Sequence, residues 1–307
     1  MGGPTPAQLS VTPALFGKFQ KLVYCETGIW LGPSKTALLC GRLYRRLMTL
    51  GLPTLERYFE CVSAPDGRDE LARMIDALTT NETRFFREPK QFDFLAETVI
   101  PRWRRETAEC RRSKRVRIWS AGCSSGEEPY SIAMLLAKHL PAADGWDVRL
   151  LATDISNRVL EKARKGIYDI ERSKDIPKDL LRRFMLQGSN DCHGQMKVQV
   201  KVQQMIEFRY LNLSQEPYAV QGPFDVILCR NVLIYFDAAS KRKGVANLVS
   251  HLAAGGYLLV GHAENLTSLS SRLRSIEPSI YAMNNAGIPQ SERDASEKGS
   301  AIGTSAR

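Results

Sequence analysis

The chain has 307 residues, which is enough for about two domains of ordinary size. Its hydrophobic fraction of 43% and charged fraction of 25% are typical of a globular protein with a full core. The apolar runs are too short for a membrane span, and residues 1–10 lack the basic and apolar regions of a secretory signal. We therefore expect a cytoplasmic protein without membrane insertion.

The formal net charge of +10 favours an acidic partner, which charge alone leaves open between nucleic acid, an anionic membrane and an acidic protein surface. The seven cysteines are an odd number and contain no C-x-x-C pair. This pattern argues against a disulfide framework and against a structural zinc site, and it favours a reducing compartment. We expect no metal.

The N-terminal region has helical periodicity and no strand pattern. Leucines recur at helical spacing over 37–48, and Gly51 is expected to end that helix. Further short helices are predicted over 55–61 and 70–78. We therefore expect a small helical domain over residues 1–80, followed by a linker over 81–115.

Three arginines, Arg42, Arg45 and Arg46, share the side of the first of these helices that faces away from the leucines. Such a face is either simply solvated or a docking surface for an acidic partner. The sequence favours the two interpretations about equally.

From residue 116 onward, short apolar runs alternate with helical patterns. Strands are predicted over 116–120, 148–153, 224–229 and 256–261, and helices over 130–140, 157–165 and 241–252. The alternation predicts an α/β fold, with a mostly parallel, Rossmann-like sheet covered by helices. We assign residues 116–284 to this domain.

Residues 196–202 interrupt this alternation because apolar and polar side chains alternate strictly there. This is the pattern of a half-exposed antiparallel strand. Together with 205–210 it predicts a small antiparallel β-subdomain inserted at about 189–210. The segment 285–307 has little to bury and is predicted to be a disordered tail.

The first predicted strand runs into Ala121-Gly122-Cys123-Ser124-Ser125-Gly126. Glycines between a strand and a helix let a ligand approach the backbone closely. The spacing is G-x-x-x-G, so the dinucleotide fingerprint is absent and a dehydrogenase is disfavoured. Taken alone, such a turn is as often structural as ligand-binding.

Asp154 lies at the carboxyl end of the second predicted strand. An acidic residue there is well placed to accept both ribose hydroxyls of a nucleoside. The alternative is a helix N-cap at Asp154 or Ser156. The preceding glycine loop favours the ribose role.

Arg230 and Asn231 directly follow a buried apolar strand, at the crevice where open α/β sheets bind ligands. The alternative is a surface salt bridge with a turn cap. Because no prolines follow Asn231, the sequence disfavours the DNA-amino methyltransferases, which extrude a base.

Together these segments resemble the chemotaxis receptor methyltransferase family, CheR. The resemblance covers about residues 10–283 and rests on several motifs in the same order. They are Leu78-Thr79-Thr80-Asn81-Glu82-Thr83-Arg84-Phe85-Phe86-Arg87, the loop from Trp119 to Ser131, Ala152-Thr153-Asp154-Ile155, Gly222-Pro223-Phe224-Asp225, Cys229 to Phe236, and Gly261-His262-Ala263-Glu264-Asn265.

The resemblance implies a helical domain, an α/β domain that binds S-adenosylmethionine (SAM), and a small β-subdomain. In some members of the family the β-subdomain binds a C-terminal receptor pentapeptide by strand addition. The cofactor-binding residues that the resemblance implies are Asn81, Thr83, Arg87, Glu128, Asp154, Asn212, Leu213, Arg230 and Asn231.

The implied reaction transfers a methyl group from SAM to a glutamate of a chemoreceptor, giving a methyl ester and S-adenosylhomocysteine. A glutamate with a pKa of about 4.3 is already ionised at neutral pH, so it needs no general base. Arg87 is expected to pair with the cofactor carboxylate or with the incoming glutamate, and Tyr235 to orient the substrate. Both are candidate catalytic residues.

The partner implied by the resemblance is the cytoplasmic helical domain of a methyl-accepting chemotaxis receptor. We expect the chain to be a monomer that does not act on nucleic acid. Two alternatives stay open. The chain could be a SAM-dependent methyltransferase of another acceptor, such as RNA or another protein, or it could be a non-catalytic SAM-binding protein.

Overall fold

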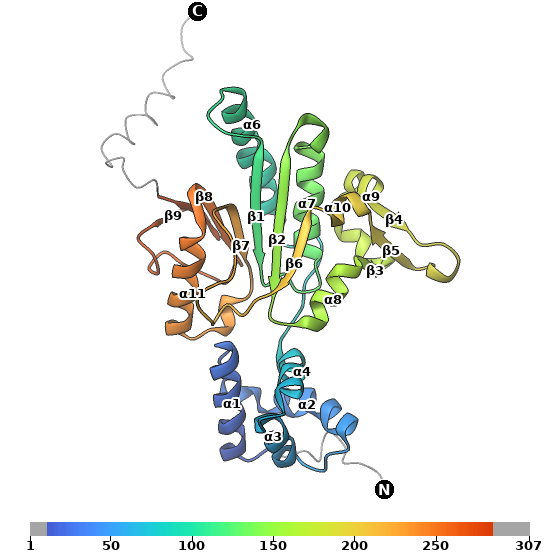
Figure 1. The fold of residues 1–307 in the computed structure, drawn as a ribbon, viewed down its shortest axis with the longest axis vertical. Coiled ribbons are helices and arrows are strands. Elements are labelled where there is room, and N and C mark those ends of the chain that lie inside the picture. The colour runs from blue at the N-terminus through green and yellow to red at the C-terminus, as the bar shows by residue number, and fades with distance from the viewer. Residues whose placement is uncertain (1–10, 285–307) are drawn as a thin grey trace, which may run out of the picture.

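A computed structural model describes residues 11–284 of the chain. Four helices near the N-terminus lie at one end of a larger α/β unit (Figure 1). Within the described residues, no helix has the length and apolar character needed to cross a bilayer. The tail predicted to be disordered, 285–307, lies outside this range.

The N-terminal helices pack around a core of their own. They are α1 (Pro13–Thr27), α2 (Thr36–Leu50), α3 (Leu55–Ser63) and α4 (Arg68–Leu78). Leu39, Leu43 and Leu47 are fully buried in this core, as their helical spacing predicts. Gly51 adopts a left-handed conformation with φ of 64°, which a side chain would disfavour, and ends α2 as predicted.

The segment predicted as a linker contains a helical run. It consists of α5 (Pro89–Phe94), a π-helical turn (Leu95–Val99) and α6 (Ile100–Ala108). Trp103 and Ile100 are buried against the sheet. The true connection to the helical domain is therefore short and ends at about Glu88.

The main sheet has seven strands in the order β6-β2-β1-β7-β8-β10-β9. Their bounds are β1 (Arg115–Ala121), β2 (Asp147–Asp154), β6 (Ile206–Tyr210), β7 (Phe224–Cys229), β8 (Leu252–Val260), β9 (Leu273–Glu277) and β10 (Ile280–Met283). The first five in spatial order are parallel, and β10 runs antiparallel to both neighbours. The predicted mostly parallel sheet is confirmed.

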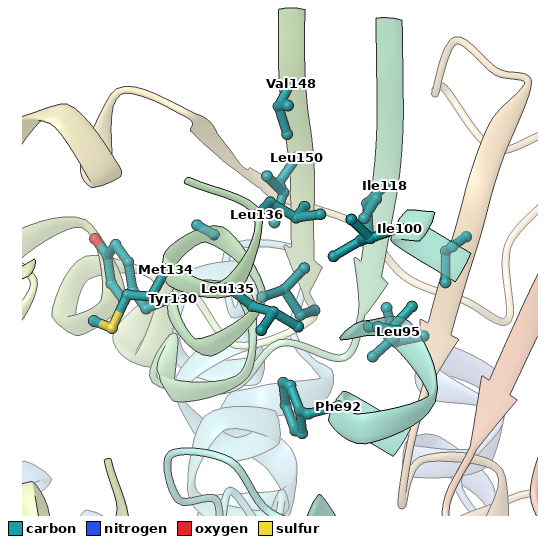
Figure 2. Packing of buried hydrophobic residues seen from close by; sticks show 14 of the residues in the cluster. Phe92, Leu95, Ile100, Ile118, Tyr130, Met134, Leu135, Leu136, Val148 and Leu150 are labelled. Atoms are coloured by element: carbon teal, nitrogen blue, oxygen red, sulfur yellow. The ribbon is translucent and has the colours of Figure 1, made fainter. Parts of the chain in front are cut away.

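Helices cover both faces of this sheet. Along β1, Val116 and Ile118 belong to the core under α5, α6 and α7 (Glu127–His139), whereas Trp119 belongs to the core under α11 (Ala238–Ser250). Figure 2 shows Leu135 and Leu136 of α7 packed against the strands. Because β1 is buried on both faces, its carboxyl end is held rigidly, and this end carries the glycine loop.

The predicted β-subdomain exists, but its predicted bounds, about 189–210, are wrong. A three-stranded antiparallel sheet in the order β3-β5-β4 is formed by β3 (Ile167–Asp169), β4 (Met185–Gln187) and β5 (Gln195–Val198), with α9 (Lys178–Phe184) between the first two. It follows α8 (Asn157–Lys165), so the insertion begins well before residue 189.

The C-terminal part of the predicted insertion also differs. Residues 206–210 form β6, which pairs in parallel with β2 at the edge of the main sheet. Half-exposed strands of either sheet can show the same alternation, as the central strand β5 of the small sheet does, so the pattern could not distinguish them. Val200–Gln203 form the short helix α10, because the amides of Val202 and Gln203 donate to the Gln199 carbonyl.

Candidate active site

A pocket lies where the carboxyl ends of β1, β2 and β7 meet the helical domain and the connecting segment. Ligands of open α/β sheets bind at this edge. The nine residues predicted to bind the cofactor all line this pocket, and so does Tyr235. They are Asn81, Thr83, Arg87, Glu128, Asp154, Asn212, Leu213, Arg230 and Asn231.

The glycine loop forms the floor of the pocket beneath these residues. The amides of Gly122 and Cys123 donate to the Thr153 carbonyl at 2.8 and 2.9 Å, which ties the loop to the end of β2. Gly122 has φ of 85°, and a Cβ at this position would overlap the Val232 side chain. Only glycine therefore allows the loops after β1 and β7 to approach this closely.

Asp154 is buried at the end of β2 with its carboxylate at the pocket. Oδ2 accepts from the Ser124 amide at 2.8 Å, and Oδ1 from the Ser156 amide at 2.9 Å. The N-cap of α8 is Ser156, whose hydroxyl accepts from the Val159 amide. Burial raises the pKa of Asp154, and each of its oxygens retains acceptor capacity for a ligand hydroxyl.

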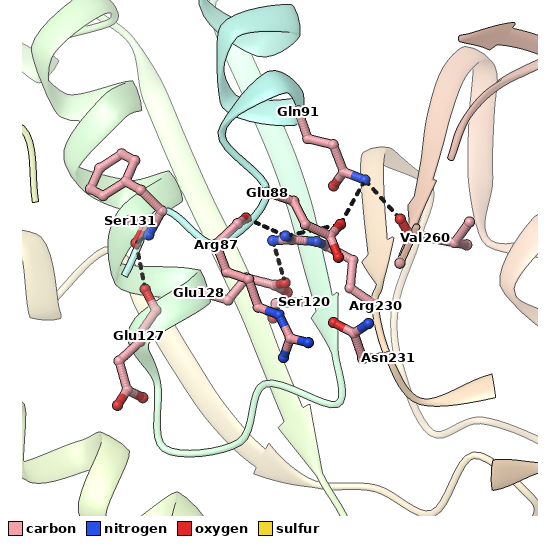
Figure 3. A network of polar contacts seen from close by, with 12 residues as sticks. Arg87, Glu88, Gln91, Ser120, Glu127, Glu128, Ser131, Arg230, Asn231 and Val260 are labelled. Carbon is pink, nitrogen blue, oxygen red and sulfur yellow. Dashed lines mark hydrogen bonds and ion pairs between the residues drawn. The ribbon is translucent and has the colours of Figure 1, made fainter. Parts of the chain in front are cut away.

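Arg230 organises a buried ionic network across the top of β7 (Figure 3). Its Nη1 lies 3.0 Å from Glu128 Oε2, and its Nη2 lies 3.2 Å from Glu88 Oε2 and also donates to the Arg87 carbonyl. Glu128 Oε1 accepts from the Ser120 hydroxyl at 2.7 Å. The Arg230 side chain is only 2% exposed, so the surface salt bridge considered from the sequence is wrong.

Glu264 fixes the backbone of the segment after β7. Its Oε2 accepts from the amides of Asn231 at 3.0 Å and Gly261 at 2.6 Å, and its Oε1 from the amide of Ile234 at 3.1 Å. Asn231 is held at φ of 59°, a conformation that non-glycine residues rarely adopt. Burial raises the pKa of Glu264. Glu264 belongs to the segment Gly261-His262-Ala263-Glu264-Asn265, and the sequence alone predicts no role for it.

The connecting segment closes the pocket from the side of the helical domain. The Ser124 hydroxyl donates to the Asn81 carbonyl at 2.9 Å, and Arg87 Nη1 donates to the Glu82 carbonyl at 3.0 Å. Arg172, which follows β3, donates to the Thr83 carbonyl at 2.9 Å.

Arg172 also lies 3.2 Å from the carboxylate of Glu127, which is fully buried at the start of α7. Burial raises the pKa of Glu127. Arg172 thus joins the β-subdomain to the connecting segment and to α7. Sequence reasoning missed it, because its partners are far away in the chain.

Asn212 holds the two domains together. Its Nδ2 donates to the Glu26 carbonyl at 2.6 Å, and its Oδ1 accepts from the Ser214 amide at 3.0 Å. Its neighbour Leu213 adds an apolar surface to the pocket.

The wall contributed by the helical domain, from Thr27 to Leu38, was not predicted from the sequence. The Trp30 amide donates to the Tyr235 carbonyl at 2.9 Å, and Ile29 forms an antiparallel bridge with Phe236. This wall exists only because the two domains dock.

The three arginines of α2 lie outside the pocket lining. Arg46 Nε donates to Glu70 Oε1 at 2.9 Å, and its side chain is 19% exposed. Arg42 donates to the Leu78 carbonyl and to the Thr80 hydroxyl. Arg45 is exposed. They therefore do not form one free cationic face, because two of them stabilise the helical domain internally.

The chain has a Rossmann-like sheet with an antiparallel strand beside its edge, a glycine loop after β1 and a buried carboxylate at the end of β2. These features define the class of SAM-dependent methyltransferases. Residues 81–282 match the family model described as CheR methyltransferase, SAM binding domain, and residues 14–79 match CheR methyltransferase, all-alpha domain. The chain belongs to the CheR methyltransferase family.

Curated relatives agree along nearly the whole chain. The chemotaxis protein methyltransferase of Escherichia coli (strain K12) is 38% identical over 277 residues, covering 90% of this chain and 93% of that protein. Chemotaxis protein methyltransferase 2 of Pseudomonas aeruginosa is 38% identical over 267 residues, covering 87% and 92%. The chemotaxis protein methyltransferase of Borreliella burgdorferi is 37% identical over 279 residues, covering 90% and 96%.

Proposed function

We propose that this methyltransferase esterifies glutamate side chains of chemotaxis receptors, giving glutamate methyl esters and S-adenosylhomocysteine. The names of the relatives support chemotaxis as the process. The observation that supports a carboxylate acceptor is that both oxygens of Glu128 already have partners. Its carboxylate is already bonded to Ser120 and Arg230, so it is not a free general base. A carboxylate acceptor needs none.

The residues that line the pocket match the chemical groups of SAM. The Asp154 carboxylate is held by two backbone amides and can accept the two ribose hydroxyls. Ile155, Leu211 and Leu213 provide an apolar lining suited to a purine ring. Arg87 also lines the pocket and brings a guanidinium whose donors match a carboxylate.

When bound, SAM supplies an electrophilic methyl group on a positively charged sulfur. Transfer would form a bond between the acceptor oxygen and the methyl carbon and break the carbon–sulfur bond, whose electron pair would stay on sulfur. No proton is transferred, so catalysis rests on alignment and on desolvation of the carboxylate.

Within this scheme Arg87 pairs with the carboxylate of the cofactor or of the incoming glutamate, and Tyr235 orients the acceptor. Both side chains line the same pocket, and Glu264 and Trp30 fix the backbone around Tyr235. Asn81, Thr83 and Asn231 complete the cofactor site. The acceptor is the cytoplasmic helical domain of a chemoreceptor, and the enzyme acts as a cytoplasmic monomer.

A transfer assay with tritiated SAM tests this function against its alternatives. The enzyme is incubated separately with membranes that carry the chemoreceptors of the same organism and with its total RNA. Label on a receptor band supports the proposal. Label on RNA would favour the nucleic-acid alternative, and SAM binding without transfer to any acceptor would indicate a non-catalytic protein.

A further inference from the structure

Trp30 presents a large apolar side chain to solvent at the edge of the active-site pocket. It is 52% exposed, whereas the other three tryptophans of the chain, Trp103, Trp119 and Trp146, are buried. Ile234, directly before Tyr235, is 46% exposed. Single exposed apolar residues are common, but two that flank a candidate catalytic residue are notable for their position.

The place of Trp30 is fixed by contacts between the domains. Its backbone amide bonds to the Tyr235 carbonyl at 2.9 Å, and its ring packs edge-on against Tyr24 with 5.9 Å between centroids. The Tyr24 hydroxyl donates to Asp237 Oδ2 at 2.9 Å. An aromatic side chain that is ordered before binding loses little conformational entropy when a partner covers it.

The wall that carries Trp30 also carries an exposed cation. Among the pocket-lining residues between Thr27 and Leu38, Lys35 is the one charged residue, and it is exposed. Glu82 lines the wall formed by the connecting segment. The wall that carries Trp30 therefore fits a segment with both apolar and acidic side chains.

We propose that Trp30, Lys35 and Ile234, here called the Trp30 rim, form the docking surface for the acceptor helix. This inference rests on the proposed function. When a glutamate of a helix enters the pocket, residues three and four positions away lie on the same helical face and meet the rim. Apolar residues at those positions contact Trp30 and Ile234, and a further acidic residue pairs with Lys35.

Steady-state kinetics with receptor-bearing membranes at saturating SAM test the rim. Trp30→Ala and Ile234→Ala should each raise KM for receptor by about tenfold, as loss of a buried aromatic or aliphatic contact does, and this rise should exceed any change in the Kd for SAM. Leu50→Ala is the matched control, since Leu50 is a 39% exposed apolar residue at the end of α2, outside the pocket lining, and should leave all constants unchanged.

A second readout is independent of turnover. With S-adenosylhomocysteine present, addition of a purified cytoplasmic receptor fragment should protect Trp30 fluorescence from acrylamide quenching, and Trp30→Phe should abolish that change. The proposal that the Trp30 rim docks the acceptor helix is wrong if receptor KM is unchanged in both alanine variants. It is also wrong if SAM affinity falls by as large a factor as receptor KM rises. If the wild-type enzyme methylates no receptor, the proposed function falls as well, so the two failures are distinguishable.

Discussion

Arg230 Nη1 lies 3.0 Å from Glu128 Oε2, and the arginine side chain is 2% exposed. Removing one partner of a buried ion pair leaves an uncompensated charge. Arg230→Ala leaves both Glu88 and Glu128 without their shared cation, so it should destabilise the fold by about 3 to 5 kcal/mol. Urea unfolding measures this loss.

The control for that variant is an exposed pair of the same kind. Arg57 and Glu60 lie 2.8 Å apart with side chains 67% and 62% exposed. Arg57→Ala should change the free energy of unfolding by no more than about 0.5 kcal/mol. Similar losses for the two variants would contradict the view that the Arg230 network is structural.

Asp154 provides a pH-dependent contact for the cofactor. Burial raises its pKa, and the ionised form is the better acceptor for hydroxyls. SAM affinity should therefore be full at neutral pH and fall by up to about tenfold per unit as the pH drops below this raised pKa. Isothermal titration calorimetry between about pH 5 and 8 follows it.

Asp154→Asn should weaken SAM binding by about ten- to a hundredfold at neutral pH and remove that pH dependence. Asp191→Asn, a change at an exposed position in the β-subdomain, is the control and should have no effect. If SAM affinity depends on pH in Asp154→Asn as it does in the wild-type protein, a group other than Asp154 controls that dependence.

Glu264 is expected to act as a positioning residue. In Glu264→Gln an NH2 group replaces one carboxylate oxygen, and this group cannot accept the backbone N–H that the oxygen binds in the wild-type protein. The Asn231–Tyr235 segment should therefore shift. Misplacement of this size should lower kcat by about ten- to a hundredfold. Because the shifted segment also carries Asn231, the Kd for SAM should rise too, but by less than kcat falls, since Asp154 keeps its contacts.

The readout is kcat measured beside the Kd for SAM, with the exposed Glu161→Gln as control. A loss of SAM affinity as large as the loss of kcat would instead place Glu264 in support of the cofactor.

Arg172 should control SAM affinity from outside the pocket. It bonds the Thr83 carbonyl and pairs with the buried Glu127, so Arg172→Ala leaves a buried carboxylate unpaired and frees the connecting segment. The Kd for SAM should rise by about tenfold. Arg182→Ala, an exposed arginine of the same subdomain, should bind SAM normally, and equal affinities in the two variants would refute the role of Arg172.

The sequence predicted elements well where burial is continuous. The strands ending at Ala121, Asp154 and Cys229 are buried on both faces, so their apolar runs and the polar residues after them locate the pocket. The half-exposed segment 206–210 was assigned to the wrong sheet, because alternation shows how a strand is exposed and not which strand it pairs with.

Contacts between distant segments were not predictable in the same way. Glu88 and Arg230 are joined only by the fold, and the Trp30 wall depends on the docking of two domains. The arginines of α2 were grouped by helical spacing alone, which does not reveal that Glu70 binds Arg46.

The chemical stability of the transferred methyl group tests the central claim most directly. Receptor labelled with tritiated SAM is exposed to mild alkali, and volatile label is collected. A glutamate methyl ester releases its label as methanol, and this is the result that we predict. Label that stays on the receptor after alkali would mean transfer to nitrogen, and it would contradict methylation of a glutamate carboxylate.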